Sequence, residues 1–343
     1  MAPVLAPTPA HIERAARALR AGRLVGMPTE TVYGMAGDAL NPAALAAIFE
    51  IKRRPFFDPL IIHVAAPHEA DALCRALPPD ARQLMDAFWP GPLTLVLPKA
   101  AHVPDLATAG LDTVAVRMPA HPVARALLQA ARRPLAAPSA NPFGGLSPTT
   151  AAHVADAFAD DETGHLECVL DGGACDIGVE STVVGWEAGR LVLLRAGGVA
   201  RETLEEILKA RVGRPTPPAG AAGSPHGPVA SPGALPWHYA PRTPLTLPGS
   251  FSAAGANGVA AENEPGRAGL LWFGPEPAPA GYDRVENLSP RGDVREAAAN
   301  LFAALHRLDA GGLARIDARL VPEAGLGTAV NERLRKAAAK GDG

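Results

Sequence analysis

Basic side chains gather at the end of a segment that has the composition of a helix. Lys52, Arg53 and Arg54 stand directly before Pro55, which cannot continue a helix. A phosphate clamp is one interpretation, because planar Arg binds phosphate oxygens in pairs and Lys supplies a mobile point charge. The alternative is that the three cations favour the C-terminal end of the helix and lie in solvent there. The segment by itself leaves both interpretations open.

Residues 138–149, PSANPFGGLSPT, combine hydroxyl, amide and glycine residues with an expected helix start. Ser139, Asn141 and Ser147, together with free backbone N–H groups, could bind an anion at this turn. Ser147 could equally act only as the cap of the following helix. The chain contains neither the P-loop order G-x-x-x-x-G-K-[ST] nor the dinucleotide fingerprint G-x-G-x-x-G, so a nucleotide site here would be of another kind.

Two short polar segments adjoin expected strands. PTETVYG at 28–34 places Thr31 at the C-terminal end of a strand, the edge at which ligands bind in open α/β sheets. IGVEST at 177–182 places Glu180 and Ser181 at the start of another strand. A simple polar turn is the alternative interpretation of the first segment.

Three titratable side chains occupy apolar strands. Arg117 lies in TVAVRMP and Arg195 ends LVLLR, and a buried Arg needs a partner that a ligand carboxylate could provide. His63 alternates with apolar neighbours in PLIIHVA, a pattern more typical of a packed core residue than of a ligand contact. The two arginines therefore indicate possible carboxylate sites.

Alternating strand and helix patterns must position these side chains. We expect strands at 23–27, 59–65, 93–98, 113–119, 134–138, 166–170, 181–186 and 191–195, and helices at 11–20, 41–54, about 67–88, 121–131, 147–158 and about 201–210. This alternation predicts an α/β layer structure with a twisted, mixed sheet. A second α/β unit is expected from strands at 245–247, 269–273 and within 314–322, and helices at 293–308 and 326–339.

The chain divides into three expected parts: a catalytic domain over 8–210, a linker over 211–243 and a smaller α/β domain over 244–343. Pro, Gly, Ala and Ser dominate the linker, which indicates a tether or a lid. It ends in Trp237, His238 and Tyr239, ring side chains that a tether does not need. We therefore expect 224–241 to be an active-site lid.

Composition excludes some classes of function. The 343 residues carry a formal net charge of −3, so no strong basic field indicates nucleic acid or a membrane surface, although local basic patches remain possible. The three cysteines form no C-x-x-C pair, which argues against zinc and suits a reducing compartment. We see no signal peptide and no apolar run of roughly 20 residues, and we expect a cytoplasmic protein.

A series of motifs occurs in a fixed order along the chain: PTETVYG, KRRPFFDPLIIH, FWPGPLTLVLP, GLDTVAVRMP, APSAN, SPT, DGG, GVEST, LLRAGG and HYAP. Together they resemble the YrdC-type threonylcarbamoyl-AMP synthases in their long, two-domain form. The resemblance covers about 10–210 in the first domain, and the tail resembles the smaller C-terminal domain of that form. It implies a YrdC-like twisted mixed sheet around a concave cavity, followed by a smaller Rossmann-like α/β domain.

The same resemblance implies roles for individual residues. The L-threonine site would comprise Thr31, His63, Arg117, Ala137 and Ser181, with Arg117 on the carboxylate. ATP would contact Lys52, Arg54, Asp58, Thr113, Ser139, Asn141, Ser147, Arg195, His238 and Tyr239, and Lys52 and Arg54 would be catalytic. Many relatives have Asn where this chain has Asp58, and an anion there would repel a triphosphate unless it meets the ribose or a magnesium ion.

The implied reaction joins L-threonine, bicarbonate and ATP with Mg²⁺ into threonylcarbamoyl-AMP and pyrophosphate. A separate transferase would then move the threonylcarbamoyl group onto adenosine 37 of tRNA, and direct contact of this chain with tRNA does not follow. No metal ligands can be assigned, since Glu30, Asp58, Asp171 and Glu180 are only candidates.

Three alternatives compete with this interpretation. The first is an RNA-binding or ribosome-maturation module with a concave basic surface, against which the net charge argues. The second is the related carbamoyl-adenylating domain of hydrogenase-maturation proteins, whose acylphosphatase and zinc-finger segments this chain lacks. The third is a regulator that binds threonine or nucleotide without turnover.

Overall fold

The computed structural model describes residues 2–216, 238–249 and 267–339. Contacts divide the chain into two compact units. The first unit consists of Met1–Phe143, Pro148–Asp176 and Glu180–Leu235, and the second of Gly144–Ser147, Ile177–Val179 and Pro236–Gly343. Two short segments that precede residue 180 thus belong to the second unit together with the residues from Pro236 onward. Most of the predicted lid at 224–241 lies outside the described residues.

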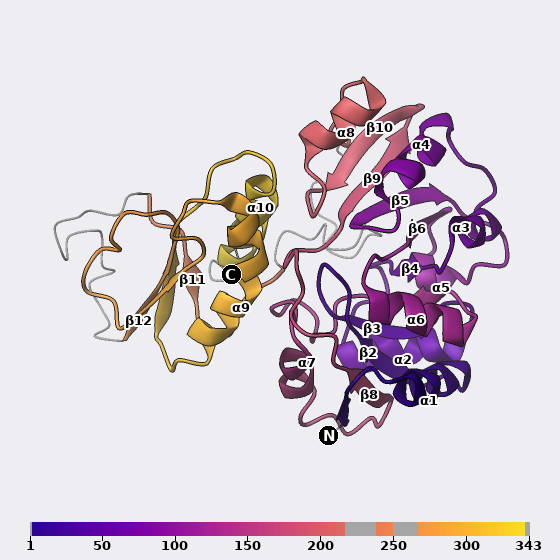
Figure 1. Cartoon of the computed structure of the whole chain (residues 1–343), viewed down its shortest axis with the longest axis horizontal. Helices are drawn as coiled ribbons and strands as arrows, with labels where there is room; N and C mark the ends of the chain where they lie inside the picture. Colours follow the sequence, from indigo (N-terminus) through magenta and orange to yellow (C-terminus); the bar gives the residue numbers. More distant parts are fainter. Residues whose placement is uncertain (1, 217–237, 250–266, 340–343) are drawn as a thin grey trace. The chain divides into compact units, whose positions relative to one another are not determined.

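The first unit is built on a ten-stranded mixed sheet (Figure 1). Its spatial order is β1-β8-β2-β3-β7-β4-β6-β5-β9-β10. In chain order the strands are β1 Val4–Leu5, β2 Leu24–Met27, β3 Gly34–Asp38, β4 Ile61–His63, β5 Leu93–Pro98, β6 Thr113–Arg117, β7 Leu135–Ala136, β8 Leu166–Leu170, β9 Thr182–Glu187 and β10 Arg190–Arg195. Parallel and antiparallel neighbours alternate irregularly, so the predicted mixed α/β architecture is confirmed.

Some helices of the first unit begin at residues whose side chains cap them. They are α1 Pro9–Arg20, α2 Pro42–Lys52, α3 Pro67–Leu73, α4 Pro79–Phe88, α5 Asp105–Thr108, α6 Pro122–Ala131, α7 Ala151–Ala157 and α8 Arg201–Leu208. Thr8 and Asn41 cap α1 and α2, and each is followed by Pro at the first helical position. These two starts are predictable because the cap and the proline coincide.

One predicted helix differs from the structure. The helical segments expected over about 67–88 are α3 and α4, and they are separated by residues 74–78, where Pro78 cannot continue a helix. The helix expected to start at Ser147 begins at Ala151, and the hydroxyl of Thr150 caps it by accepting a hydrogen bond from a backbone N–H. The interpretation of Ser147 as a helix cap is therefore wrong.

The two faces of the large sheet are covered by different helices. On one face, α1 and α6 pack against each other and bury Val25, Leu135 and Ala137 (Figure 1). The opposite face forms the larger core with residues of α2, α4, α7 and α8. Leu95 and Val116 of β5 and β6 belong to this second core. The alternate positions of β5 and β6 therefore point to the face that carries Leu135 and Ala137.

The second unit contains four parallel strands in the order β11-β14-β12-β13. These are β11 Leu245–Thr246, β12 Ala268–Trp272, β13 Arg284–Asn287 and β14 Arg315–Ala318. Helix α9, Val294–Asp309, begins at its cap residue Asp293 and packs on α10, Gly327–Ala338 (Figure 1). Leu270 of β12, Phe302 of α9 and Leu334 of α10 are all fully buried. A second, smaller α/β unit with a parallel sheet is thus confirmed.

Candidate active site

Arg117 is a buried charged residue of the large sheet whose guanidinium group makes several hydrogen bonds. It ends β6 with 3% exposure. Its Nε donates to Gly91 O at 3.1 Å, Nη1 donates to Thr31 Oγ1 at 2.9 Å, and Nη2 donates to Glu30 Oε1 at 2.6 Å. A guanidinium group has five N–H donors, so one N–H on each terminal nitrogen is left after these contacts. The predicted need of Arg117 for a partner is met inside the protein by Glu30.

Glu30 lies in the loop between β2 and β3, and its two carboxylate oxygens have different partners. Oε1 accepts from Arg117, whereas Oε2 accepts from the backbone N–H groups of Ala120 at 3.0 Å and His121 at 3.4 Å, before α6. Burial raises the pKa of this carboxyl, but the charge and hydrogen bond of Arg117 act together with backbone hydrogen bonds in the opposite direction, and the net pKa is lowered. Glu30 is therefore a buried carboxylate that fixes the orientation of Arg117.

His63 lies beside Arg117 in the sheet. The two residues are direct partners in the parallel β4–β6 register, so their side chains share a face. His63 is 2% exposed, and its Nδ1 has no hydrogen-bond partner among the described residues. Burial first, and then the charge of Arg117, lower the pKa of His63 to about 3. The imidazole is thus neutral at physiological pH and available as a polar contact.

Ser181 belongs to a second buried polar group next to Arg117. Its Oγ is 2.7 Å from Thr94 Oγ1 and accepts from Arg195 Nη2 at 3.2 Å. Arg195 also donates from Nε and Nη2 to the Ser181 carbonyl, at 3.2 and 2.9 Å. Leu95 of β5 pairs with Val116 of the antiparallel strand β6. Thr94 therefore lies opposite Arg117 in the neighbouring strand. The register therefore brings the Ser181 group alongside the Arg117 group.

The backbone around Ser181 is held by a glycine. A Cβ atom on Gly197 would lie 2.3 Å from Glu180 O and 2.4 Å from the Ser181 carbonyl carbon. Gly198 N donates to the same Glu180 carbonyl at 3.0 Å. The LLRAGG motif therefore contains a glycine because a side chain would collide with the main chain that carries Ser181.

Lys52 and Arg54 are both buried, with 1% and 7% exposure, so the solvated interpretation is wrong for them. Exposed Arg53 ends α2 in the left-handed conformation, with φ 51°. Lys52 Nζ donates to the carbonyls of Ser139 and Asn141. Burial lowers the pKa of Lys52 well below its ordinary value, Arg54 lowers it further, and Asp58 raises it.

Asp58 is the internal counter-ion of Arg54. Its Oδ2 lies 2.9 Å from Arg54 Nη2, and the two side chains are 0% and 4% exposed. Arg54 also donates to the carbonyls of Asp58 and Pro59, and its guanidinium carbon lies 5.9 Å from the centroid of the Phe143 ring. The anion at position 58 thus faces an arginine, which accounts for its presence without a ribose or a metal ion.

Thr113 starts β6, four residues before Arg117, and both side chains point to the same face of the strand. Thr113 pairs with Pro98 and is half-buried. Ile61 of β4 pairs with Ala115 of β6, so Thr113, two residues earlier in β6, lies level with Pro59. The Pro59 carbonyl accepts a hydrogen bond from Arg54. Thr113 therefore lies toward the Arg54 end of the sheet, away from His63.

Three predicted ATP contacts lie in the second unit. The Ser147 carbonyl is 3.2 Å from His306 Nε2 on α9. His238 and Tyr239 are buried, with ring centroids 4.2 Å apart, and the Tyr239 ring lies 5.9 Å from that of Phe302. All three residues are thus parts of the packed unit that contains α9.

The described sheet therefore brings most of the predicted residues into neighbouring groups. Thr31, His63 and Arg117 form one group, Ser181 and Arg195 a second, and Lys52, Ser139 and Asn141 a third, while Arg54 pairs with Asp58. Ala137 follows β7 and is buried on the Arg117 face.

Sequence reasoning named Glu30 as a polar residue of the PTETVYG turn and a candidate metal ligand, but not as the partner of Arg117, and it missed Thr94. A glutamate between two threonines in PTETVYG, together with a strand arginine that needs a partner, was the available signal for Glu30. Thr94 stands among leucines and valines in LTLVLP, where one hydroxyl on an apolar strand is a weak signal. Both side chains are buried against predicted site residues, so they extend the candidate site.

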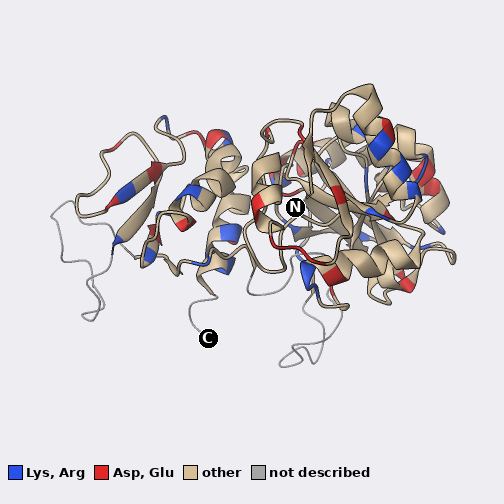
Figure 2. Cartoon of the chain, turned by 90° about the horizontal axis from the view of Figure 1, so that it is seen from below, with Lys and Arg blue, Asp and Glu red and all other residues tan. Residues whose placement is uncertain are grey.

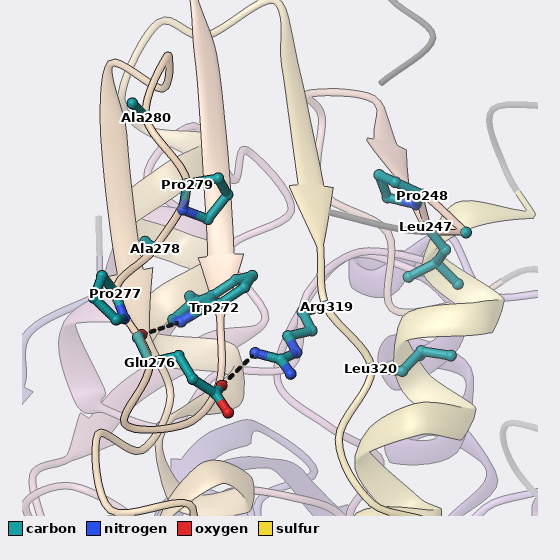
Figure 3. Close-up of a pocket in the computed structure, with 11 residues that line it drawn as sticks. Leu247, Pro248, Trp272, Glu276, Pro277, Ala278, Pro279, Ala280, Arg319 and Leu320 are labelled. Atoms are coloured by element: carbon teal, nitrogen blue, oxygen red, sulfur yellow. Dashed lines mark hydrogen bonds and ion pairs between the residues drawn. The ribbon is translucent and has the colours of Figure 1, made fainter. Parts of the chain in front are cut away.

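A pocket of about 950 Å³ lies in the second unit, at the carboxyl ends of β11, β12 and β14 (Figure 3). Arg319 covers the Trp272 ring, with its guanidinium carbon 4.4 Å from the ring centroid, and it donates to Glu276 at 2.9 Å (Figure 3). The indole N–H donates to the Glu276 carbonyl at 2.9 Å. None of the predicted site residues lines this pocket.

Charged side chains are distributed over both units. Among the described residues, Lys, Arg, Asp and Glu are interspersed and gather on no single element (Figure 2). No group of three or more His, Cys, Asp or Glu side chains in residues 2–216, 238–249 and 267–339 could hold a metal ion. In the same ranges no helix has the length and apolar character needed to cross a membrane.

Comparison with known proteins gives full-length matches. Residues 17–197 match the family described as "Telomere recombination", named for Sua5, YciO and YrdC, and residues 199–339 match "Threonylcarbamoyl-AMP synthase, C-terminal domain". The chain is 42% identical to the threonylcarbamoyl-AMP synthase of Pyrococcus abyssi, covering 95% of this chain and 93% of that one. It is 39% identical to the Bacillus subtilis enzyme of the same name, covering 96% and 93%. The crystal structure of P. abyssi Sua5 complexed with L-threonine matches with a TM-score of 0.84, at 41% identity and 96% and 94% coverage.

Proposed function

The chain belongs to the threonylcarbamoyl-AMP synthase family, and we propose that it joins L-threonine, bicarbonate and ATP into threonylcarbamoyl-AMP, with pyrophosphate as the second product. The observation that carries the proposal is the arrangement of Arg117. This buried guanidinium is locked by Glu30, Thr31 and Gly91, yet keeps one N–H on each terminal nitrogen. Two parallel N–H donors are what a carboxylate needs for a bidentate, charge-assisted contact.

The amino-acid substrate would lie over the Arg117 face of the sheet. Its carboxylate would take the remaining Arg117 donors, while the hydroxyls of Thr31 and Ser181 and the neutral imidazole of His63 offer polar contacts for the amine and hydroxyl. Buried Ala137 would bound the site with a methyl group. The support for this placement is that the side chains share one face or adjoin it, and the related P. abyssi protein forms a complex with L-threonine.

ATP would lie toward the Lys52 and Arg54 end of the same region. Lys52 and Arg54 would bind the phosphates, and the negative charge of a triphosphate would favour the charged form of Lys52, whose pKa is lowered by burial. Ser139, Asn141, Thr113 and Arg195 would complete the contacts. We propose that Ser147, His238 and Tyr239 contact the nucleotide as well. Mg²⁺ would enter as part of the substrate MgATP, because Mg²⁺ commonly uses phosphate oxygens with few protein ligands.

The proposed chemistry has two steps. The threonine amine adds to CO₂ formed from bicarbonate by loss of hydroxide, and loss of one proton from nitrogen leaves a carbamate. A carbamate oxygen then attacks the α-phosphorus of ATP, the bond between that phosphorus and the bridging oxygen breaks, and pyrophosphate departs. Transfers of this kind depend on positioning and charge neutralisation more than on covalent catalysis. Lys52 and Arg54 would supply that neutralisation as the catalytic pair.

Pyrophosphate release from MgATP, with L-threonine and bicarbonate each omitted in turn, tests the proposal. Release that needs both substrates is the expected result. Release that does not need threonine would identify a different acceptor. ATP binding without release would favour a regulator, and RNA binding that weakens steeply with salt would favour the RNA-binding module.

The proposed product is the substrate of a later group-transfer reaction. A mixed anhydride of a carbamate and AMP is a reactive acyl donor, so a transferase must consume it, and we propose the tRNA threonylcarbamoyl transferase as the downstream partner in the cytoplasm. To test this step, labelled threonine, ATP and bicarbonate are incubated with that transferase and tRNA, with and without this chain. Label should reach adenosine 37 only when this chain is present.

A further inference from the structure

Two pairs of buried hydroxyl groups lie at the proposed threonine contacts of the large sheet. Thr29 Oγ1 is 2.9 Å from Thr31 Oγ1, and Thr94 Oγ1 is 2.7 Å from Ser181 Oγ. All four side chains are at most 2% exposed. A hydroxyl group has one proton to donate and two lone pairs that accept. The partners of each oxygen therefore determine whether it can donate to a substrate or accept from one.

The proton of Thr29 is used on the main chain. Its Oγ1 donates to the Val32 carbonyl at 2.6 Å and accepts from the backbone N–H groups of Thr31 and Val32, both at 3.2 Å. Because Thr29 has no second proton, Thr31 is the donor in the contact between the two hydroxyl groups. Arg117 Nη1 donates to Thr31 Oγ1 at 2.9 Å. Thr31 keeps one lone pair and no free proton, so toward a substrate it is an acceptor.

The partners of Ser181 leave its proton free. Arg195 Nη2 donates to Ser181 Oγ at 3.2 Å. Thr94 is fully buried, and in the part of the chain that the structure describes its hydroxyl group has Ser181 Oγ as its one partner. A buried hydroxyl proton without an acceptor costs free energy, so Thr94 donates to Ser181. Both lone pairs of Ser181 Oγ are then filled, and toward a substrate Ser181 is a donor.

The acceptor that Thr31 offers is uncharged. The carboxylate of Glu30 contacts Arg117 through Oε1, and its Oε2 accepts from the N–H groups of Ala120 and His121. An amine beside Arg117 would therefore meet a hydroxyl oxygen and a cation, not a free carboxylate. A nearby cation disfavours a second positive charge. These surroundings favour the uncharged amine, which is the form that attacks carbon dioxide.

We propose that Thr29 and Thr94 are positioning residues, which give the two hydroxyl groups of the threonine site opposite hydrogen-bonding roles. Thr31 accepts from the substrate amine, and Ser181 donates to the oxygen of the substrate's side-chain hydroxyl. The substrate carboxylate takes the remaining Arg117 donors, which leaves these two groups of threonine for the two contacts. An N–H donated to Thr31 keeps the nitrogen lone pair free for carbon dioxide. The inference rests on the proposed function, because Thr31 and Ser181 are substrate contacts only within it.

The first test compares Thr94→Val with Thr94→Ser, using L-threonine and L-2-aminobutyrate. The second compound has hydrogen in place of the threonine hydroxyl, so it lacks the oxygen that Ser181 reaches. In pyrophosphate release, Thr94→Val should raise the KM for L-threonine about three- to tenfold, the effect of one poorly oriented hydrogen bond. The inhibition constant of L-2-aminobutyrate should not change. Thr94→Ser retains the donor and should restore the KM for L-threonine.

Thr108→Val is the matched control for loss of a buried hydroxyl group. Thr108 is 1% exposed and donates to the Leu111 carbonyl at 3.0 Å, and its other partners, Lys99 and Asp105, are not proposed site residues. This variant should change neither ligand. A purely structural effect of Thr94→Val would weaken both ligands alike. Equal changes for the two ligands, or no change for either, would therefore overturn the role of Thr94.

A second pair of variants decides the matter if Thr94→Val does not fold. In Thr29→Val the proton of Thr31 loses its acceptor and can turn to the lone pair of the amine. The kcat of pyrophosphate release should then fall about tenfold, because that hydrogen bond must break before the nitrogen attacks, while the KM for L-threonine changes less than about threefold. Thr29→Ser should restore kcat. A raised KM with unchanged kcat, or no recovery in Thr29→Ser, would count against the proposal.

Failure of the proposed function has a different signature. If the unmodified chain releases no pyrophosphate, the synthase activity fails, and equilibrium binding of L-threonine and L-2-aminobutyrate to the Thr94 variants decides the hydroxyl arrangement. The ratio of the two affinities should fall in Thr94→Val and recover in Thr94→Ser. An unchanged ratio in Thr94→Val, or a chain that does not bind L-threonine, would overturn the arrangement.

Discussion

The Oε1 atom of Glu30 lies 2.6 Å from Nη2 of Arg117, inside the sheet face that carries the proposed threonine contacts. The two residues are 87 positions apart, and both side chains are less than a tenth exposed. A substrate carboxylate would therefore meet an arginine whose charge is already partly neutralised and whose orientation is already fixed. Such a site gains selectivity from geometry, because only an anion that fits the remaining donors is bound.

Glu30→Gln should weaken both folding and threonine binding. Breaking one side of a buried ion pair costs about 3 kcal/mol of unfolding free energy, and the released Arg117 should raise the KM for threonine. Glu13→Gln is the matched control, because Glu13 and Arg20 are 2.7 Å apart but are 47% and 37% exposed, and exposed pairs contribute at most about 1 kcal/mol. Urea unfolding and threonine titration measure both effects. Equal losses in the two variants would refute the role of Glu30.

The same glutamate should contribute to acid sensitivity. Because the pKa of Glu30 is lowered in the native chain from an ordinary 4.5, its stabilising contribution is fully present above that value and is lost as pH falls through the lower native pKa. The unfolding free energy should therefore fall below about pH 4.5. Glu30→Gln should lose less stability over this interval, as measured by urea unfolding at about pH 6 and at several points below about 4.5.

His63 should make stability depend on pH in a higher window. Its pKa falls from 6.5 in the unfolded chain to about 3 in the native one. Between these values the unfolded chain binds a proton that the native chain does not, so acidification favours unfolding by at most about 1.4 kcal/mol per pH unit from this group. His63→Gln should reduce the slope of unfolding free energy between about pH 7 and 5, whereas the exposed His102→Gln should not. An unchanged slope in His63→Gln would contradict the buried neutral imidazole.

Asp58→Asn should alter ATP binding more than removal of a carboxylate from the protein surface does. Removing the carboxylate leaves the triphosphate as the main counter-ion of Arg54, so the KM for ATP should fall several-fold. Loss of one partner of this buried ion pair should cost about 3–5 kcal/mol in unfolding free energy. Asp71→Asn is the control, because Asp71 and Arg82 are also 2.9 Å apart but are 42% and 47% exposed. An unchanged KM in Asp58→Asn would contradict this expectation, and a raised KM would show that Asp58 serves ATP binding.

Gly197→Ala should disable the site near Ser181. The added methyl group would meet the Glu180 carbonyl at 2.3 Å and the Ser181 main chain at 2.4 Å, and the resulting shift should lower kcat/KM for threonine by about 10–100-fold. Gly249→Ala is the control, since a Cβ there meets no atom within 4 Å. The measurement is pyrophosphate release by both variants, with their unfolding temperatures compared. Equal kcat/KM for threonine in the two variants would exclude a steric role for Gly197.

The regular elements were largely predictable, and the exceptions have physical causes. Strand β5 was predicted with its observed bounds because LTLVLP is an apolar run between turn residues. Strand β3, GMAGD, gave no signal, since it has two glycines and no β-branched residue. It exists because Gly34 and Gly37 allow the close approach of Ala137 and Leu24, a reason that lies in other parts of the chain. The strands β1 and β13 and the short helix α5 were also missed.

Sequence motifs supplied residues for the proposed site but not the ion pairs that these residues form. Motif order supplied Arg117, Thr31 and Ser181, yet no local pattern could say that Glu30 neutralises Arg117 or that Asp58 neutralises Arg54. The Glu30–Arg117 pair spans 87 residues and depends on the register of several strands. The wrong prediction of a helix start at Ser147 had the same cause. Ser-Pro is a helix-start signal, but the carbonyls of Pro148 and Thr149 accept hydrogen bonds from the backbone N–H groups of Tyr33 and Cys175, so the helix begins after Thr150.

The two-residue period of β5 and β6 separates two kinds of evolutionary change. Substitutions at Leu95 or Val116 repack the core, and selection on folding governs them. Substitutions at the alternate positions, such as Val96 or Ala115, change the shape of the surface beside Arg117 and leave the core side chains in place. The surface beside Arg117 can therefore change in shape while the core of the same scaffold is kept.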